Sequence, residues 1–171
     1  MHVKLLNHAE AEFSIERLSE ILIDAVAQGA GVSFMHPLSN QDAKDYWRSQ
    51  LSAVAAGKTF IFVCTDRTGT MTGTVMLQKS WAPNQPHRAD VAKLLVHSDY
   101  RRQGVASALV LALEKHASAI GLTLLTFDAV AGGGAEGFYR TMGYVPVGVI
   151  PGYAYSGNGK LDDTMFFYKT L

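Results

Sequence analysis

The chain has 171 residues, of which 48% are hydrophobic and 18% charged, a composition typical of a globular protein and unlike that of a disordered chain. Lysine plus arginine equals aspartate plus glutamate at 15 each, and this balance argues against a general nucleic-acid binder. The single cysteine, Cys64, can form no disulfide within the chain and lies in an apolar run, where a buried thiol is expected.

The first part of the chain is expected to form one short strand followed by two helices. Residues 1–7 are expected to be an edge strand. Ser14 is a good N-cap for the first helix, because apolar side chains then recur at helical spacing until two glycines near residue 30. Ser39, with Asp42 three residues later, resembles a capping box and begins the second helix.

Three strands are expected in the middle of the chain, followed by a third helix. The strands are 59–65, 71–80 and 89–97, which are rich in apolar and β-branched residues. Residues between the first two strands are typical of a hairpin turn. After Gly104 apolar residues return to helical spacing, which predicts a helix that ends at Gly121.

The last part is expected to form a strand, a short helix and two further strands. Their ranges are 122–128, 135–142, 144–149 and 164–169, with a loop over 151–163 between the last two. The full order is β-α-α-β-β-β-α-β-α-β-β. It predicts one α/β (α+β) domain over residues 1–171, with a mixed, mostly antiparallel central sheet that has helices on both faces.

The segment from Val91 to Ala106 carries the clearest chemical signal. A buried strand runs into a basic turn, and the turn opens a helix. The first N–H groups of a helix have no acceptor within it and point outward along a favourable dipole, so such an end binds phosphate. Gly104 lets the backbone approach a ligand closely, and Arg101 and Arg102 add positive charge. The sequence therefore predicts a site for a diphosphate.

These residues resemble a known family. Residues 101–106 read RRQGVA and match the Arg/Gln-x-x-Gly-x-Gly/Ala signature of the GNAT superfamily of acyl-coenzyme A-dependent N-acetyltransferases. Residues 135–144 resemble a later motif of that family, Ala-x-x-Phe-Tyr-x-x-x-Gly-Phe, and the order of elements is also that of the family. More narrowly, segments 31–35, 87–94, 151–153 and 167–171 resemble tabtoxin-resistance acetyltransferases, which act on an amino-acid-like toxin.

The resemblance implies a GNAT-like fold and acetyl-coenzyme A as co-substrate, without a metal. The pyrophosphate would lie on the turn, and the pantetheine arm would pair with the preceding strand. The residues implied in coenzyme A binding are Leu95, Val96, Arg101, Arg102, Gln103, Gly104, Val105 and Ala106. Family members often carry an asparagine where this chain has Gly132, so contacts of that side chain are absent here or made by the backbone.

Acetyl transfer to an amine needs a proton acceptor and a proton donor. Tyr139 aligns with the family tyrosine and is the candidate acid for the leaving thiolate. Asp90 and Asp128 are the candidate bases, since the resemblance places acidic residues with this role at both positions. The sequence leaves the choice between them open.

The acceptor is expected to be a primary amine of a small molecule, with an amino-acid-like toxin or an antibiotic as one option. Three aromatic or apolar loop residues are candidates for lining its pocket: Phe34, Met35 and Tyr153. An alternative function is a non-catalytic acyl-coenzyme A sensor, which would keep the phosphate turn but need neither the tyrosine nor the aspartates. A dinucleotide-binding enzyme is a weaker alternative, because Gly132 to Gly137 match Gly-x-Gly-x-x-Gly but too few elements follow.

Other partners are not indicated by the sequence. The histidines lack the spacing of a metal site, and no nucleic-acid partner is expected. The N-terminus lacks the apolar stretch of a signal peptide, and no run of apolar residues is long enough for a membrane helix. We therefore expect a cytoplasmic protein without membrane contact, either a monomer or a homodimer.

Overall fold

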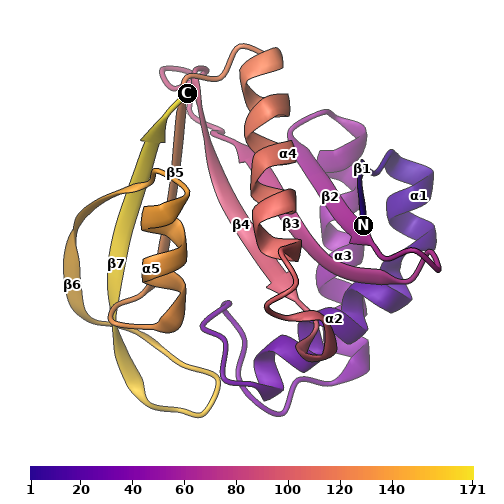
Figure 1. Cartoon of the computed structure of the whole chain (residues 1–171), viewed down its shortest axis with the longest axis horizontal. Helices are drawn as coiled ribbons and strands as arrows, with labels where there is room; N and C mark the ends of the chain where they lie inside the picture. Colours follow the sequence, from indigo (N-terminus) through magenta and orange to yellow (C-terminus); the bar gives the residue numbers. More distant parts are fainter.

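A computed structural model describes all residues, 1–171, as a seven-stranded sheet with helices on both faces (Figure 1). In chain order the elements are β1 (His2–Leu5), α1 (His8–Phe13), α2 (Ile15–Ala27), α3 (Asn40–Ala55), β2 (Thr59–Thr65), β3 (Met71–Lys79), β4 (Arg88–Val96), the 3-10 turn η1 (Ser98–Tyr100), α4 (Val105–Ala119), β5 (Leu124–Val130), α5 (Gly134–Thr141), β6 (Val145–Tyr155) and β7 (Leu161–Thr170). The strand order is β1-β2-β3-β4-β5-β7-β6, and only β4 and β5 pair parallel. The predicted mixed, mostly antiparallel sheet is confirmed.

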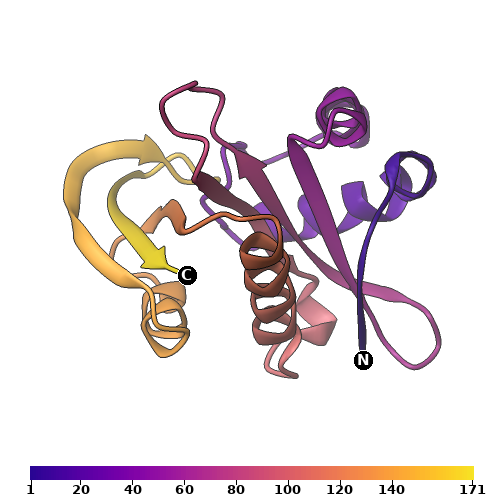
Figure 2. The same cartoon turned by 90° about the horizontal axis from the view of Figure 1, so that it is seen from above.

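Each face of the sheet has its own core, because side chains alternate between the faces of a strand. In β2, Ile61 and Val63 pack with the helices α1 to α3, whereas Phe62 and Cys64 pack with α4. Figure 2 shows α1, α2 and α3 on one side of the sheet and α4 and α5 on the other. The predicted burial of Cys64 is confirmed: its side chain is fully buried, and burial raises the pKa of its thiol.

The N-terminal helical region differs from the prediction. Asn7, not Ser14, provides the first cap, since its side chain accepts from the N–H of Glu10 while the Glu10 carboxylate accepts from the N–H of Asn7. This capping box begins the additional short helix α1. Ser14 lies between α1 and α2 and makes no side-chain cap, whereas the predicted cap of α3 by Ser39 is confirmed.

The last two strands are longer than predicted. β6 continues to Tyr155 and β7 begins at Leu161, so the expected loop over 151–163 is wrong except for five connecting residues. The strand register shifts between Ile150 and Ala154, and this irregularity accommodates Pro151 and Gly152. A proline is tolerated there because β6 is an edge strand of the sheet.

Two irregularities of β4 open the sheet. Its pairing with β5 covers only three residue pairs, from Arg88 with Leu124 to Asp90 with Thr126, and beyond them the strands diverge. Its register against β3 also shifts, because Ala92 pairs with Met76 but Leu95 pairs with Thr74. The extra residues form a bulge in which Lys93 has a φ of 51°.

Candidate active site

The turn before α4 leaves a run of backbone donors free. None of the N–H groups of residues 102–107 donates a hydrogen bond to another group of the protein. Gly104 has φ 81° and ψ 4°, a left-handed conformation that favours glycine, and no side chain caps the helix. These N–H groups converge at the positive end of the helix dipole, so an anion can bind there.

A cavity of about 230 Å³ lies against this turn. Its lining residues are Val96, Tyr100, Arg101, Arg102, Gly104, Val105, Ala106, Ser107 and Phe138. Arg101 Nε donates to the carbonyl oxygen of Val96 at 3.3 Å, which ties the basic turn to the end of β4. The structure thus brings together Val96 and all residues predicted on the turn except Gln103, whose side-chain amide donates to the carbonyl oxygen of Asp99.

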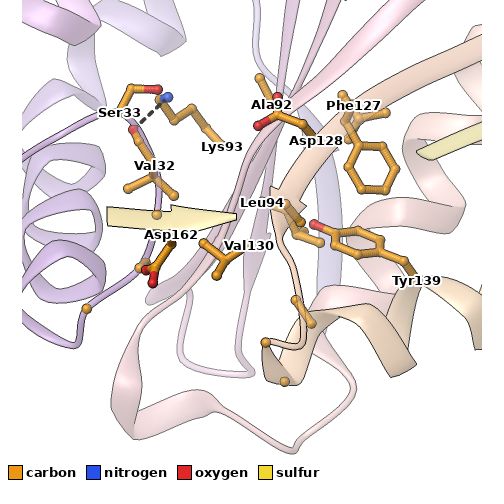
Figure 3. A pocket seen from close by; sticks show the side chains of 18 residues that line it. Val32, Ser33, Ala92, Lys93, Leu94, Phe127, Asp128, Val130, Tyr139 and Asp162 are labelled. Carbon is orange, nitrogen blue, oxygen red and sulfur yellow. Dashed lines mark hydrogen bonds between the residues drawn. The ribbon is translucent and has the colours of Figure 1, made fainter. Parts of the chain in front are cut away.

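A larger cavity of about 440 Å³ lies where β4 and β5 diverge (Figure 3). Its walls come from the loop after α2, from β4 and β5, from the start of α5, and from Asp162 of β7. Leu94 lines this cavity and Val96 lines the smaller one, so both open along the same strand. Leu95, between them, is buried in the opposite core and offers only its backbone.

Tyr139 reaches the larger cavity from α5. Its ring is buried against Phe127, with ring centroids 4.3 Å apart, and against Phe167. Its hydroxyl points toward Leu94 in Figure 3. Burial, together with the negative charge of Asp128, raises the pKa of Tyr139 to about 12, so the hydroxyl keeps its proton at neutral pH.

Of the two predicted aspartates, only Asp128 lines the cavity. Partial burial raises the pKa of its carboxyl above the usual value, and the negative charge of Asp90 adds to this, while Lys93 opposes it. Asp90 instead accepts hydrogen bonds from the Thr126 hydroxyl and from Arg88 Nη1, the latter at 2.6 Å. Its carboxylate is therefore occupied within the paired part of β4 and β5.

Lys93 is a site residue that was not predicted from the sequence. Its ammonium donates to the carbonyl oxygen of Val32 at 2.9 Å and lies over the rings of Phe34 and Tyr46. Burial lowers the pKa of Lys93, and Asp128 partly opposes this shift. A lysine within the apolar run of β4 was the signal available in the sequence.

The predicted acceptor residues are dispersed. Phe34 packs beneath Lys93 and against Tyr46, so it supports the cavity wall without lining it. Met35 is half exposed and lines neither cavity. Tyr153 lines a third cavity of about 200 Å³ that shares Asp128 and Asp162 with the large one. Asp162 had not been predicted as a site residue.

Several further observations bear on the expected partners. No helix of the structure is both long and apolar enough to cross a membrane. No three or more His, Cys, Asp or Glu side chains are grouped as metal ligands would be. At Gly132, where members of the related family often carry an asparagine, φ is 67°, and the backbone N–H donates to the Glu136 carboxylate.

Comparisons with known proteins agree with this geometry. Residues 16–144 match the model of the acetyltransferase (GNAT) family. The fold is similar to that of a ribosomal-protein-alanine N-acetyltransferase from Brucella melitensis, with a TM-score of 0.81 at 17% identity over 100% of both chains. It is also similar to an N-acetyltransferase from Staphylococcus aureus Mu50, with a TM-score of 0.80 at 16% identity over 99% of both chains. A GNAT superfamily phosphinothricin acetyltransferase from Sinorhizobium meliloti, in complex with acetyl-coenzyme A, gives a TM-score of 0.84 at 16% identity over 100% of this chain and 89% of that one.

Proposed function

Because the chain belongs to the acetyltransferase (GNAT) family, we propose that it transfers the acetyl group of acetyl-coenzyme A to a primary amine of a small molecule. The observation that carries this proposal is the run of free N–H groups over residues 102–107 beside one cavity, together with a second cavity on the same strand, β4, that is lined by Asp128 and Tyr139. A similar fold binds acetyl-coenzyme A in the Sinorhizobium meliloti enzyme, which supports the assignment of the donor. The need for this thioester supports action in the cytoplasm.

The residues of the turn fit a diphosphate. Free N–H groups at the start of α4 and the two arginines supply hydrogen bonds and positive charge. The backbone of Leu95 and Val96 would then hold the pantetheine arm along the end of β4. This direction leads the thioester toward Leu94, next to the Tyr139 hydroxyl.

In the proposed reaction, Asp128 takes a proton from the ammonium form of the acceptor. The neutral nitrogen attacks the thioester carbon, and the carbon–sulfur bond breaks as the sulfur takes a proton from Tyr139. The second proton on the nitrogen passes through water to the tyrosinate, which restores the hydroxyl, and Asp128 releases the first proton to solvent. Partial burial helps the first step, because it raises the pKa of Asp128 and lowers that of an amine bound beside it.

The proposed function is tested by two measurements on the same preparation. Calorimetry with acetyl-coenzyme A reports binding, and release of coenzyme A with a panel of primary amines reports transfer. We expect binding in the first and amine-dependent release in the second. Binding without release for any amine would instead favour the non-catalytic sensor, and absence of binding would contradict both functions.

Replacing Tyr139 with phenylalanine is expected to lower kcat by about 10²-fold, because the leaving sulfur loses its proton donor. The Phe ring keeps the packing against Phe127 and Phe167, so acetyl-coenzyme A binding by calorimetry is expected to persist. Tyr144→Phe is the matched control, since Tyr144 packs on the same Phe127 ring but does not line the cavity. Unchanged kcat in the Tyr139 variant would remove this residue from the mechanism.

The pH dependence of kcat/KM is expected to shift when Lys93 is replaced with methionine. Groups that face Asp128 or share its cavity are Lys93 and Asp90 from β4, Tyr139 from α5 and Asp162 from β7. Lys93 lowers the pKa of Asp128, so its removal raises that pKa. The acidic limb of the profile then moves to higher pH, because the base is protonated sooner as the pH falls.

Lys93→Arg is the control for this experiment. Arginine keeps the positive charge, so the acidic limb is expected to stay near its wild-type position even if kcat changes. An acidic limb at the same pH in the methionine variant would show that Lys93 does not act on the base.

A further inference from the structure

The large cavity is continued on the side of β7 by the third one. Both are lined by Gly31, Ser33, Asp128, Val130 and Asp162. The third cavity adds the end of β6 and the residues after it, including Tyr153, Tyr155 and Ser156. Asp128 therefore lies at the junction between the end that would hold the thioester and an end that is lined by aromatic and hydroxyl groups.

We call the large and the third cavity together the joint cavity. Negative charge exceeds positive charge among its lining side chains. Its only charged side chains are Asp128, Asp162 and Lys93. The Lys93 ammonium donates to the carbonyl oxygen of Val32 and lies over the rings of Phe34 and Tyr46. The joint cavity thus has two carboxylates against one ammonium, and its third-cavity end has both carboxylates and no cation among its lining side chains.

Two cations outside the joint cavity, Lys160 and Arg88, are also paired. Lys160 Nζ forms an ion pair with Asp162 Oδ1 at 2.9 Å, but the Lys160 side chain is 76% exposed and lines neither cavity. The Asp162 side chain is only 14% exposed, so its charge acts on the cavity more than that of Lys160 does. Arg88 is bound to Asp90, Gln85 and Thr126.

From this charge distribution we infer that the acceptor is a primary amine without a carboxylate, whose far end is uncharged or positively charged. The inference rests on the proposed function, since it assumes that the acceptor enters at Asp128. Asp128 receives the reacting amine, while Tyr153, Tyr155 and Asp162 surround the far end. The rings of the tyrosines suit an aryl group or a second ammonium. A carboxylate in the same place meets two like charges and no counter-ion. Amino-acid-like acceptors, which the sequence left as an option, fit this cavity less well.

Matched pairs of acceptors that differ by one carboxylate test this inference. Tyramine is compared with tyrosine, and cadaverine with lysine, by the release of coenzyme A from acetyl-coenzyme A. We expect kcat/KM to be at least about tenfold higher for the amine than for the amino acid in at least one pair. Equal or better use of the amino acids overturns the inference, and so does turnover of neither member of either pair.

The Asp162→Asn variant locates the origin of the preference. It is expected to reduce the ratio of kcat/KM between the amine and the amino acid of a pair, because one of the two negative charges that repel a carboxylate is removed. Asp163→Asn changes the net charge equally, but Asp163 binds the N–H of Gly152 and does not line either cavity, so the preference is expected to persist. A preference unchanged by Asp162→Asn overturns the role of Asp162. Calorimetry with acetyl-coenzyme A and release of coenzyme A with the wider amine panel separate these results from failure of the proposed function. The proposed function fails if the donor does not bind or if no amine is acetylated, whereas release with some amines but without the expected preference contradicts this inference alone.

Discussion

Replacing Asp128 with asparagine is expected to lower kcat/KM for acetyl transfer by about 10²- to 10⁴-fold. The amide side chain keeps the size and hydrogen-bonding capacity of the carboxylate but cannot take a proton from the acceptor. The turn at residues 102–107 is untouched, so acetyl-coenzyme A is expected to bind with its wild-type affinity in calorimetry. The loss therefore appears in turnover with the amine and not in donor binding.

Asp90→Asn provides the comparison that decides between the two aspartates. The Asp90 carboxylate is held by Arg88 and Thr126 and does not line the cavity. An asparagine there retains one oxygen acceptor for these partners, so kcat/KM is expected to stay close to the wild-type value. If Asp90→Asn removes turnover while Asp128→Asn preserves it, the assignment of the base to Asp128 is wrong.

Replacing Gly104 with glutamate is expected to weaken acetyl-coenzyme A binding by at least about 100-fold. A Cβ at this position meets only the Met1 side chain, at 3.9 Å, so the folded protein has room for the new side chain. The carboxylate, however, lies beside the free N–H groups that would hold the diphosphate, where it repels the phosphates and competes for their donors. Calorimetry with acetyl-coenzyme A measures the loss directly.

Two controls separate charge from backbone strain in this experiment. Gly104→Ala has the same unfavourable φ without the charge, so it is expected to retain more affinity than the glutamate variant. Gly121 has a φ of 81° and open space around it, and it follows the far end of α4, so Gly121→Glu adds similar strain and the same charge away from the site. Wild-type affinity in Gly104→Glu would mean that the diphosphate binds elsewhere.

Local signals in the sequence predicted the parts of the fold that depend on nearby residues. β2 was predicted with its observed bounds, because residues 59–65 form an unbroken run of β-branched, aromatic and apolar side chains. The helix after Gly104 is predicted by apolar residues at helical spacing, which is also a local signal. The prediction of Ser14 as the first helix cap is wrong, although the sequence contains the local signal of the true cap, Asn7 with Glu10 three residues later.

The parts that depend on strand register could not be predicted. Asp90 and Asp128 both lie near strand ends in the sequence, yet the β4–β5 pairing stops at Asp90 and Thr126, which leaves only Asp128 beside the opening. The bulge that turns Lys93 toward Val32 arises from a shift in strand register against β3. No local sequence pattern predicts such a shift. The sequence predicts a loop at Asp162, but this residue belongs to β7, and the pairing of that strand brings it to the cavity.

The burial of Cys64 has a practical consequence for the assays of this enzyme. Acetyl transfer converts the thioester of acetyl-coenzyme A into a free thiol. Aromatic disulfide reagents react with this thiol and release a coloured thiolate, so the reaction can be followed continuously. The only thiol of the polypeptide is fully buried in the core beneath α4, and burial raises its pKa, so very little of it is ionised and accessible to such a reagent. The colour that develops in native enzyme therefore reports product alone, and a single cysteine introduced on the surface can carry a spectroscopic label without first removing the natural one.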